Sequence, residues 1–141
     1  MKRYVFLCFT LMLFTVCHAQ GKKFSPEKFD AEMTDFITKE ALLTDEEAIK
    51  FFPLLREMHK KQRCLYKKMR DGGKEKPATE EGCAAAIRER DKLDIELKQL
   101  EQSYHKKMMQ VLPASKVYDA IRAESQFHRR MMKGWQKGRC H

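Results

Sequence analysis

Two long stretches of the sequence carry apolar residues at alternating spacings of three and four, and this pattern constrains the fold more than any other feature. One stretch begins at Thr44 and the other at Thr79. Such spacing places the apolar side chains on one narrow stripe of an α-helix, as in a coiled coil. We therefore expect two long helices that pack along seams. The first seam comprises Ala48, Phe52, Leu55, His59, Gln62, Tyr66 and Met69, widened by Phe51, Met58 and Leu65, and the second comprises Ala86, Arg90, Leu93, Leu97, Leu100, Tyr104, Met108 and Val111.

Capping residues and helix breakers predict four helices and no strands. Ser25 before a proline and Thr79 after the Gly72–Pro77 break are typical N-caps. Thr44 and Glu47 have the spacing of a capping box, in which each side chain binds the other residue's backbone N–H. The first three predicted helices cover residues 26–42, 44–70 and 79–111, and the second of them should be about 40 Å long. The fourth follows Pro113 and ends in a frayed tail. Its apolar residues are Val117, Ile121, Phe127, Met131 and Trp135. The fold class is all-α, with a long antiparallel helical hairpin.

Pro53 lies inside the second predicted helix, nine residues after its cap. Its ring removes the hydrogen bond to the Ile49 carbonyl and pushes that carbonyl away. The sequence has no capping residue just before Pro53, which favours a kink over a new helix that starts after a short turn.

The first 19 residues have the pattern of a secretory signal peptide. Lys2 and Arg3 precede an apolar run over residues 4–16, and Ala19 ends a cleavage site. The run is short for a membrane span. We therefore expect a periplasmic protein whose residues 20–141 form a single all-helical domain.

The charge of the chain indicates its partners. The full chain carries +9, and +7 remains once the leader takes Lys2 and Arg3 with it. Export argues against nucleic acid, so an acidic client chain or an anionic membrane surface is the better partner. The sequence contains no Gly-rich phosphate loop, serine elbow or HExxH motif. We therefore expect neither an enzyme nor a cofactor.

The stretch Leu43-Thr44-Asp45-Glu46-Glu47 resembles the LTxxQ motif of the Spy/CpxP family of small periplasmic stress proteins. Glu47 stands where the family usually has Gln, and both serve in a capping box. The family's second copy corresponds here to Leu112–Lys116, which keeps only the Leu. The resemblance implies an elongated, curved helical homodimer and ATP-independent chaperone activity, or a role in envelope-stress or metal-stress signalling.

The leading hypothesis is therefore a holdase-type chaperone that binds unfolded or misfolded proteins under envelope stress. The alternatives are a metal-responsive regulator or metal buffer, and a coiled-coil partner of one envelope protein. The client-binding residues that we expect are Phe51, Phe52, Met58, Arg122, Phe127, Arg129, Arg130 and Met131.

Two repeats of similar sequence, HKKMM and HRRMM, underlie the metal alternative. They place His105 with Met109, and His128 with Met132, on single helical faces. Imidazole and thioether together suit Cu(I). Methionines that fill an irregular seam explain the same residues, and this reading is favoured.

The cysteines leave several pairings open. Cys64, Cys83 and Cys140 remain after the leader is removed, so at least one is free or pairs between chains. Cys64 and Cys83 lie at the same level of the expected hairpin, but Cys64 faces away from the seam. An interchain bond through Cys64 or Cys140 is the alternative, and Cys140-His141 makes a poor metal site.

Secretion should leave a mature chain that begins at Gln20. Mass spectrometry of the N-terminal peptide of the exported protein measures this. An intact Met1, or a lipidated Cys17, would contradict a soluble periplasmic form.

Overall fold

The computed structural model describes residues 25–138, and side chains as far as Gly134. These residues form four α-helices and no strand: α2 (Pro26–Glu40), α3 (Asp45–Gly72), α4 (Glu80–Val111) and α5 (Ala114–Gly138). The predicted all-helical fold is confirmed for this part of the chain. The expected signal peptide, the leader up to residue 24, and Cys140 and His141 lie outside the described residues, as does the side chain of Trp135. No helix in the described part combines the length and apolarity that crossing a membrane requires.

The predicted helix starts are confirmed by the caps that the structure shows. The Ser25 side chain accepts a hydrogen bond from the Lys28 N–H, and Thr79 accepts one from the Gly82 N–H. At the start of α3 the Thr44 hydroxyl accepts from the Glu47 N–H at 3.2 Å, and the Glu47 carboxylate accepts from the Thr44 N–H at 2.9 Å. Side-chain acceptors thus satisfy backbone donors that would otherwise lack partners.

The first helix ends two residues earlier than the sequence predicts. It stops at Glu40, and Leu42 adopts a left-handed conformation with φ 49°. The Leu43 N–H donates back to the Thr38 carbonyl at 3.0 Å, which closes the end of the helix. The carbonyls of Ala41 and Leu42, directly after α2, accept hydrogen bonds from Lys116 of α5.

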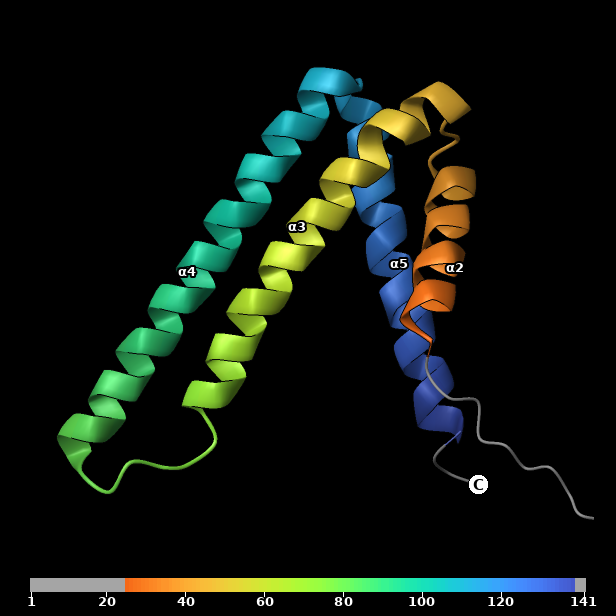
Figure 1. The fold of residues 1–141 in the computed structure, drawn as a ribbon. Helices are drawn as coiled ribbons and strands as arrows, with labels where there is room; N and C mark the ends of the chain where they lie inside the picture. Colours follow the sequence, from red (N-terminus) through yellow and green to blue (C-terminus); the bar gives the residue numbers. More distant parts are fainter. Residues whose placement is uncertain (1–24, 139–141) are drawn as a thin grey trace, which may run out of the picture.

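Pro53 lies inside a continuous α3. A separate helix that starts after a short turn, the alternative considered from the sequence, is therefore not formed. Figure 1 shows the first turns of α3 crossing the top of the molecule before the helix turns down beside α4. The proline ring is exposed and fills no space in the core. The bend follows from the missing hydrogen bond and from the ring's clash with the preceding turn.

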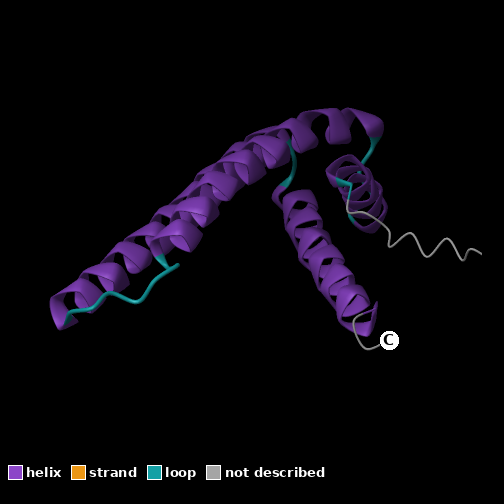
Figure 2. Cartoon of the chain, turned by 60° about the horizontal axis from the view of Figure 1, so that its bottom comes forward, coloured by secondary structure: helices purple, strands orange, loops and turns teal. Residues whose placement is uncertain are grey.

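The helices are arranged as two arms that meet at an apex. In Figures 1 and 2, α3 and α4 lie side by side and form the long arm, while α2 lies beside α5 in a second, shorter arm. The arms diverge below the apex, where α4 passes into α5. This geometry leaves an open angle between the arms, bounded by side chains of all four helices.

The main apolar core lies where the arms meet, and its largest fully buried side chains include Phe51, Tyr104 and Met108. A smaller cluster of Leu65, Leu93 and Leu97 holds α3 to α4 further along the long arm. The predicted seams are confirmed at these positions but not at Tyr66, Arg90 and Val111, which are exposed. The sequence prediction also missed Ala120 and Ala123, which are buried on α5. Their small side chains let α5 pack closely.

Lys116 ties the start of α5 to the junction of α2 and α3. Its ammonium donates to the carbonyls of Ala41 and Leu42, and its Nζ lies 3.5 Å from a Glu47 carboxylate oxygen. A cation at a helix C-terminus compensates the partial negative charge of the last carbonyls. The two stretches compared with the LTxxQ motif therefore meet at the apex, because Leu43 and Leu112 are buried in the same core.

Replacing Pro53 with alanine should raise the melting temperature by a few degrees, on the order of 1 kcal/mol, because α3 regains a backbone hydrogen bond. Thermal unfolding followed by circular dichroism measures the change, with Lys60→Ala as a control at an exposed position of the same helix. A lower melting temperature for Pro53→Ala would show that the apex core requires the bend.

Candidate functional site: the cleft between the two arms

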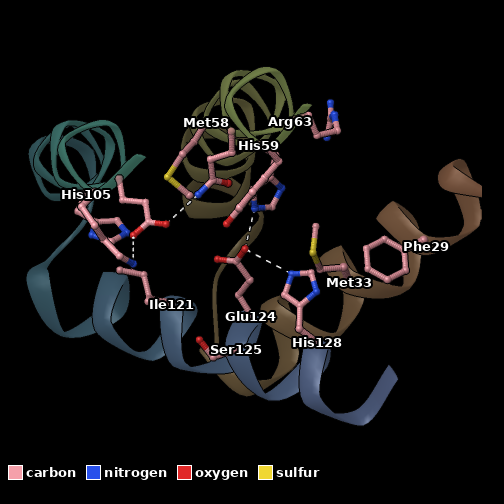
Figure 3. Close-up of a pocket in the computed structure, with 14 residues that line it drawn as sticks. Phe29, Met33, Met58, His59, Arg63, His105, Ile121, Glu124, Ser125 and His128 are labelled. Atoms are coloured by element: carbon pink, nitrogen blue, oxygen red, sulfur yellow. Dashed lines mark hydrogen bonds and ion pairs between the residues drawn. The ribbon is translucent and has the colours of Figure 1, made fainter. Parts of the chain in front are cut away.

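The angle between the arms contains a cleft of about 560 Å³. Ligand pockets in proteins have volumes of this order and combine apolar walls with a few polar groups. Figure 3 shows the side chains that line it. They are Phe29, Met33, Met58, His59, Gln62, Arg63, Tyr66, Lys98, Glu101, His105, Ile121, Glu124, Ser125 and His128.

Glu124 of α5 is the polar centre of the cleft. Its Oε1 lies 2.6 Å from Nε2 of His59, which belongs to the other arm, and 3.6 Å from Nε2 of His128, one turn further along α5. Figure 3 shows the carboxylate pointing between the two imidazole rings. The side chains of Glu124 and His59 are each 16% exposed. The His59–Glu124 contact is therefore a short, largely desolvated hydrogen bond between the arms.

Opposing effects act on the pKa of Glu124. Burial of the carboxylate by itself would raise the pKa, because it removes the charged form from water. The interactions with His128 and His59, through hydrogen bonding and through charge, outweigh burial and lower the pKa to about 2. The ionised carboxylate is therefore the form that the folded cleft stabilises.

A second carboxylate, Glu101 of α4, lies on the long-arm side of the cleft. Its Oε1 accepts a hydrogen bond of 3.1 Å from the Gln62 amide, and its Oε2 lies 2.9 Å from the Lys98 ammonium. The Gln62 contact joins α3 to α4 within one arm, and the Lys98 contact lies within α4. Glu101 thus resembles Glu124 in chemistry but does not bridge the arms.

The apolar wall of the cleft is formed by Phe29 and Met33 of α2, Met58 of α3 and Ile121 of α5. The Phe29 ring packs at 5.2 Å, centroid to centroid, against Phe127 in an edge-to-face arrangement, which orders this wall. Arg63 and His105 add cationic or polar groups at the edges, and neither has a carboxylate partner within residues 25–138. The cleft thus combines apolar surface with one cation, Arg63, and one imidazole, His105, that make no ion pair with a carboxylate among the described residues.

The structure places most of the predicted client-binding apolar residues in the core. Phe51 is 1% exposed, and Phe52, Met58 and Phe127 are also buried. Met131 is half-buried. These side chains hold the helices together, so a client cannot reach most of them in this conformation, although Met58 reaches the inner wall of the cleft.

The three predicted arginines differ in their surroundings. Arg130 lies over the Phe36 ring, with the guanidinium carbon 4.6 Å from the ring centroid, so it contributes to packing. Arg122 lines a shallow depression with Glu40 and Asp119 on another face of the second arm. Arg129 is exposed. None of the three lines the cleft.

The residues of the metal alternative are only partly brought together. His105 and His128 both line the cleft, whereas Met109 and Met132 are 47% and 52% exposed and lie outside it. Across residues 25–138, no group of three or more His, Cys, Asp and Glu side chains is arranged to hold a metal ion. The predicted ligand set of two His and two Met therefore does not converge on one point in this conformation.

Cys64 and Cys83 are both free thiols, so the intrachain disulfide considered from the sequence is not formed. Cys64 is exposed, and the Cys83 thiol donates to the Pro77 carbonyl at 3.5 Å. The different faces of the two residues, noted from the sequence, account for this result.

Sequence reasoning missed Glu124. It placed His59 on the seam of α3 and His128 in a possible metal set, but it gave Glu124 no role. The available signal was the spacing of four between Glu124 and His128, which puts both on one helical face.

Comparison with protein-family models, curated proteins and solved structures finds no match to the chain.

Lowering the pH should remove the stability that Glu124 contributes. Its folded-state pKa is depressed from 4.5 to about 2, so the contribution is present above pH 4.5 and is lost as the pH falls toward 2. The depression corresponds to about 3 kcal/mol. Glu124→Gln should lower the free energy of unfolding at pH 7 by up to this amount. The free energy of unfolding of the variant should also fall less than that of the wild type between pH 4.5 and pH 2. Urea titration at several pH values measures both effects.

The matched control is Glu101→Gln, which changes the same chemistry in the same cleft. This variant should keep the acid-dependent loss, because Glu124 is intact. If both variants lose the same free energy of unfolding at pH 7 and show the same pH dependence, the contacts of Glu124 with the two histidines do not account for the acid sensitivity.

Proposed function

We propose that the protein is a periplasmic, ATP-independent holdase-type chaperone that binds unfolded client proteins under envelope stress. The observation that carries the proposal is the open cleft between the arms, with its apolar wall and its unpartnered Arg63 and His105. Weak apolar contact and long-range attraction of acidic segments suit a binder that accepts many sequences. The resemblance of residues 43–47 to the LTxxQ motif supports the same class.

Of the client-binding residues predicted from the sequence, only Met58 lines the cleft, so the other client contacts are proposed to come from residues that the sequence did not indicate. Met33, Met58 and Ile121 supply the cleft wall. Among large apolar side chains outside the cleft, Leu42 is 76% exposed and Ile49 is 74% exposed. Exposed apolar groups of this kind provide contact surface without disturbing the core.

The long arm is proposed to act as an antiparallel helical hairpin and to pair with a second copy of the chain. Its small inner cluster of Leu65, Leu93 and Leu97 gives it little core of its own. Ile87 and Ile95 lie exposed on α4, two turns apart. A homodimer would cover such a thin layer and present two clefts.

A metal-responsive function is the second candidate, because His105 and His128 share the cleft although they are 23 positions apart in sequence. Titration of the purified protein with Zn(II) and Cu(I) tests it. Tight binding with a change of oligomeric state, together with no effect on client aggregation, would replace the chaperone proposal.

The protein should suppress aggregation of a chemically denatured model client without ATP, and suppression should weaken as salt rises, because exposed charges are screened within roughly 10 Å at 0.1 M. Light scattering of the diluted client measures this. Absence of suppression at every salt concentration would refute the proposal.

Charge-reversal variants locate the client surface. Arg63→Glu, at the cleft edge, should slow client capture several-fold, whereas Arg88→Glu makes the same charge change at an exposed position of α4 outside the cleft and should have little effect. Arg122→Glu with Arg129→Glu tests the remaining predicted residues, and Arg130 stays in place because it packs on Phe36. Equal effects of Arg63→Glu and Arg88→Glu would assign capture to net charge alone.

A further inference from the structure

Two ion pairs cross between the arms below the apex, and they differ in exposure. Arg56 of α3 pairs with Asp30 of α2 at 3.0 Å, with side chains 49% and 40% exposed. His59 pairs with Glu124 across the cleft, and both side chains are largely buried. Exposed pairs stabilise little because water screens them, whereas a desolvated hydrogen-bonded pair depends strongly on both partners keeping their charge.

We propose that His59, Glu124 and His128 form a proton-controlled latch, which holds the two arms together and releases them when Glu124 becomes protonated. Release widens the cleft and uncovers its apolar wall. The latch regulates the client site of the proposed function, and to that extent it rests on that function.

The surroundings of Glu124 make it the acid-sensitive group of the cleft. From α3 it faces His59, and Gln62, Arg63 and Tyr66 of the same helix also line the cleft, whereas α2 contributes the apolar Phe29 and Met33 to the lining. The lining groups of α4 are Lys98, Glu101 and His105, and those of α5 are Ser125 and His128. Glu101 is held by Gln62 and Lys98 within the long arm, so its protonation does not separate the arms.

The size of the effect follows from linkage between protonation and opening. The carboxyl pKa is about 2 in the closed cleft, and in an opened, solvated cleft it returns toward 4.5. Acidification from pH 6 to pH 3 therefore shifts the closed-to-open equilibrium by about 30-fold, and complete protonation shifts it by about 300-fold. A population change of this size is measurable if the closed form dominates at neutral pH.

The distance between the far ends of the arms reports the latch directly. Spin labels are attached at Arg70→Cys on α3 and Lys133→Cys on α5, both exposed positions, in exported protein whose native cysteines are replaced by serine. Pulsed electron paramagnetic resonance should show one narrow distance distribution at pH 6 and a longer, broader distribution at pH 3. Circular dichroism in the same buffers confirms that the helices remain folded.

Variants separate the latch from general acid effects. Glu124→Gln should give the long distribution at pH 6, without any acid, and little further change at pH 3. Glu101→Gln should behave like the wild type. An unchanged distance in Glu124→Gln at pH 6, or equal opening in Glu101→Gln, would overturn the proposal.

The distance measurement contains no client, so its outcome is independent of chaperone activity. If the arms open on acidification and the protein suppresses no aggregation at any pH, the latch stands and the proposed function fails. If aggregation is suppressed and the arm distance does not respond to Glu124→Gln, the latch fails alone. If both stand, suppression at pH 6 should be stronger for Glu124→Gln than for the wild type.

Discussion

Burial of apolar side chains at the apex is the interaction on which the rest of the structure depends. Phe51, Tyr104, Met108 and Val117 come from three helices and are almost completely inaccessible to water. Each such side chain contributes about 1.5–3 kcal/mol when it is fully buried. Because the chain is rich in charge, with 35% Asp, Glu, Lys and Arg, one such core is formed where all four helices meet. The Nζ atoms of Lys61 and Lys107 lie over the Tyr104 ring, 5.2 and 4.5 Å from its centroid, in cation–π contacts at the edge of this core.

Below the apex, polar contacts replace the apolar packing that the diverging arms cannot form. A carboxylate placed between helices with no partner would cost more than it contributes. Glu124 avoids this cost because two imidazoles surround it, and Glu101 does so through Lys98 and Gln62. The cleft therefore remains open without leaving a buried charge uncompensated, and the orientation of one arm relative to the other depends on groups that exchange protons with water.

Local features of the chain were predictable from the sequence, and long-range pairings were not. The caps at Ser25, Thr44 and Thr79 and the bend at Pro53 depend on residues within one turn, so their spacing alone reveals them. The contacts His59–Glu124 and Lys116–Glu47 join residues 65 and 69 positions apart, and they depend on which helices face each other. Periodicity also identified an apolar face at Phe51 and Phe52, but it did not show that the face is covered.

The separation of the two apolar clusters has a consequence for how the chain opens. The apex cluster includes side chains of all four helices, whereas the cluster of Leu65, Leu93 and Leu97 involves α3 and α4 alone. Backbone amides near the apex should exchange their hydrogens with solvent only when most of the molecule unfolds. Amides of α3 and α4 near the 73–79 loop should exchange through fraying of that end, because few buried side chains hold it. The stability of the long arm is therefore expected to be highest where it joins the apex and lowest at its free end.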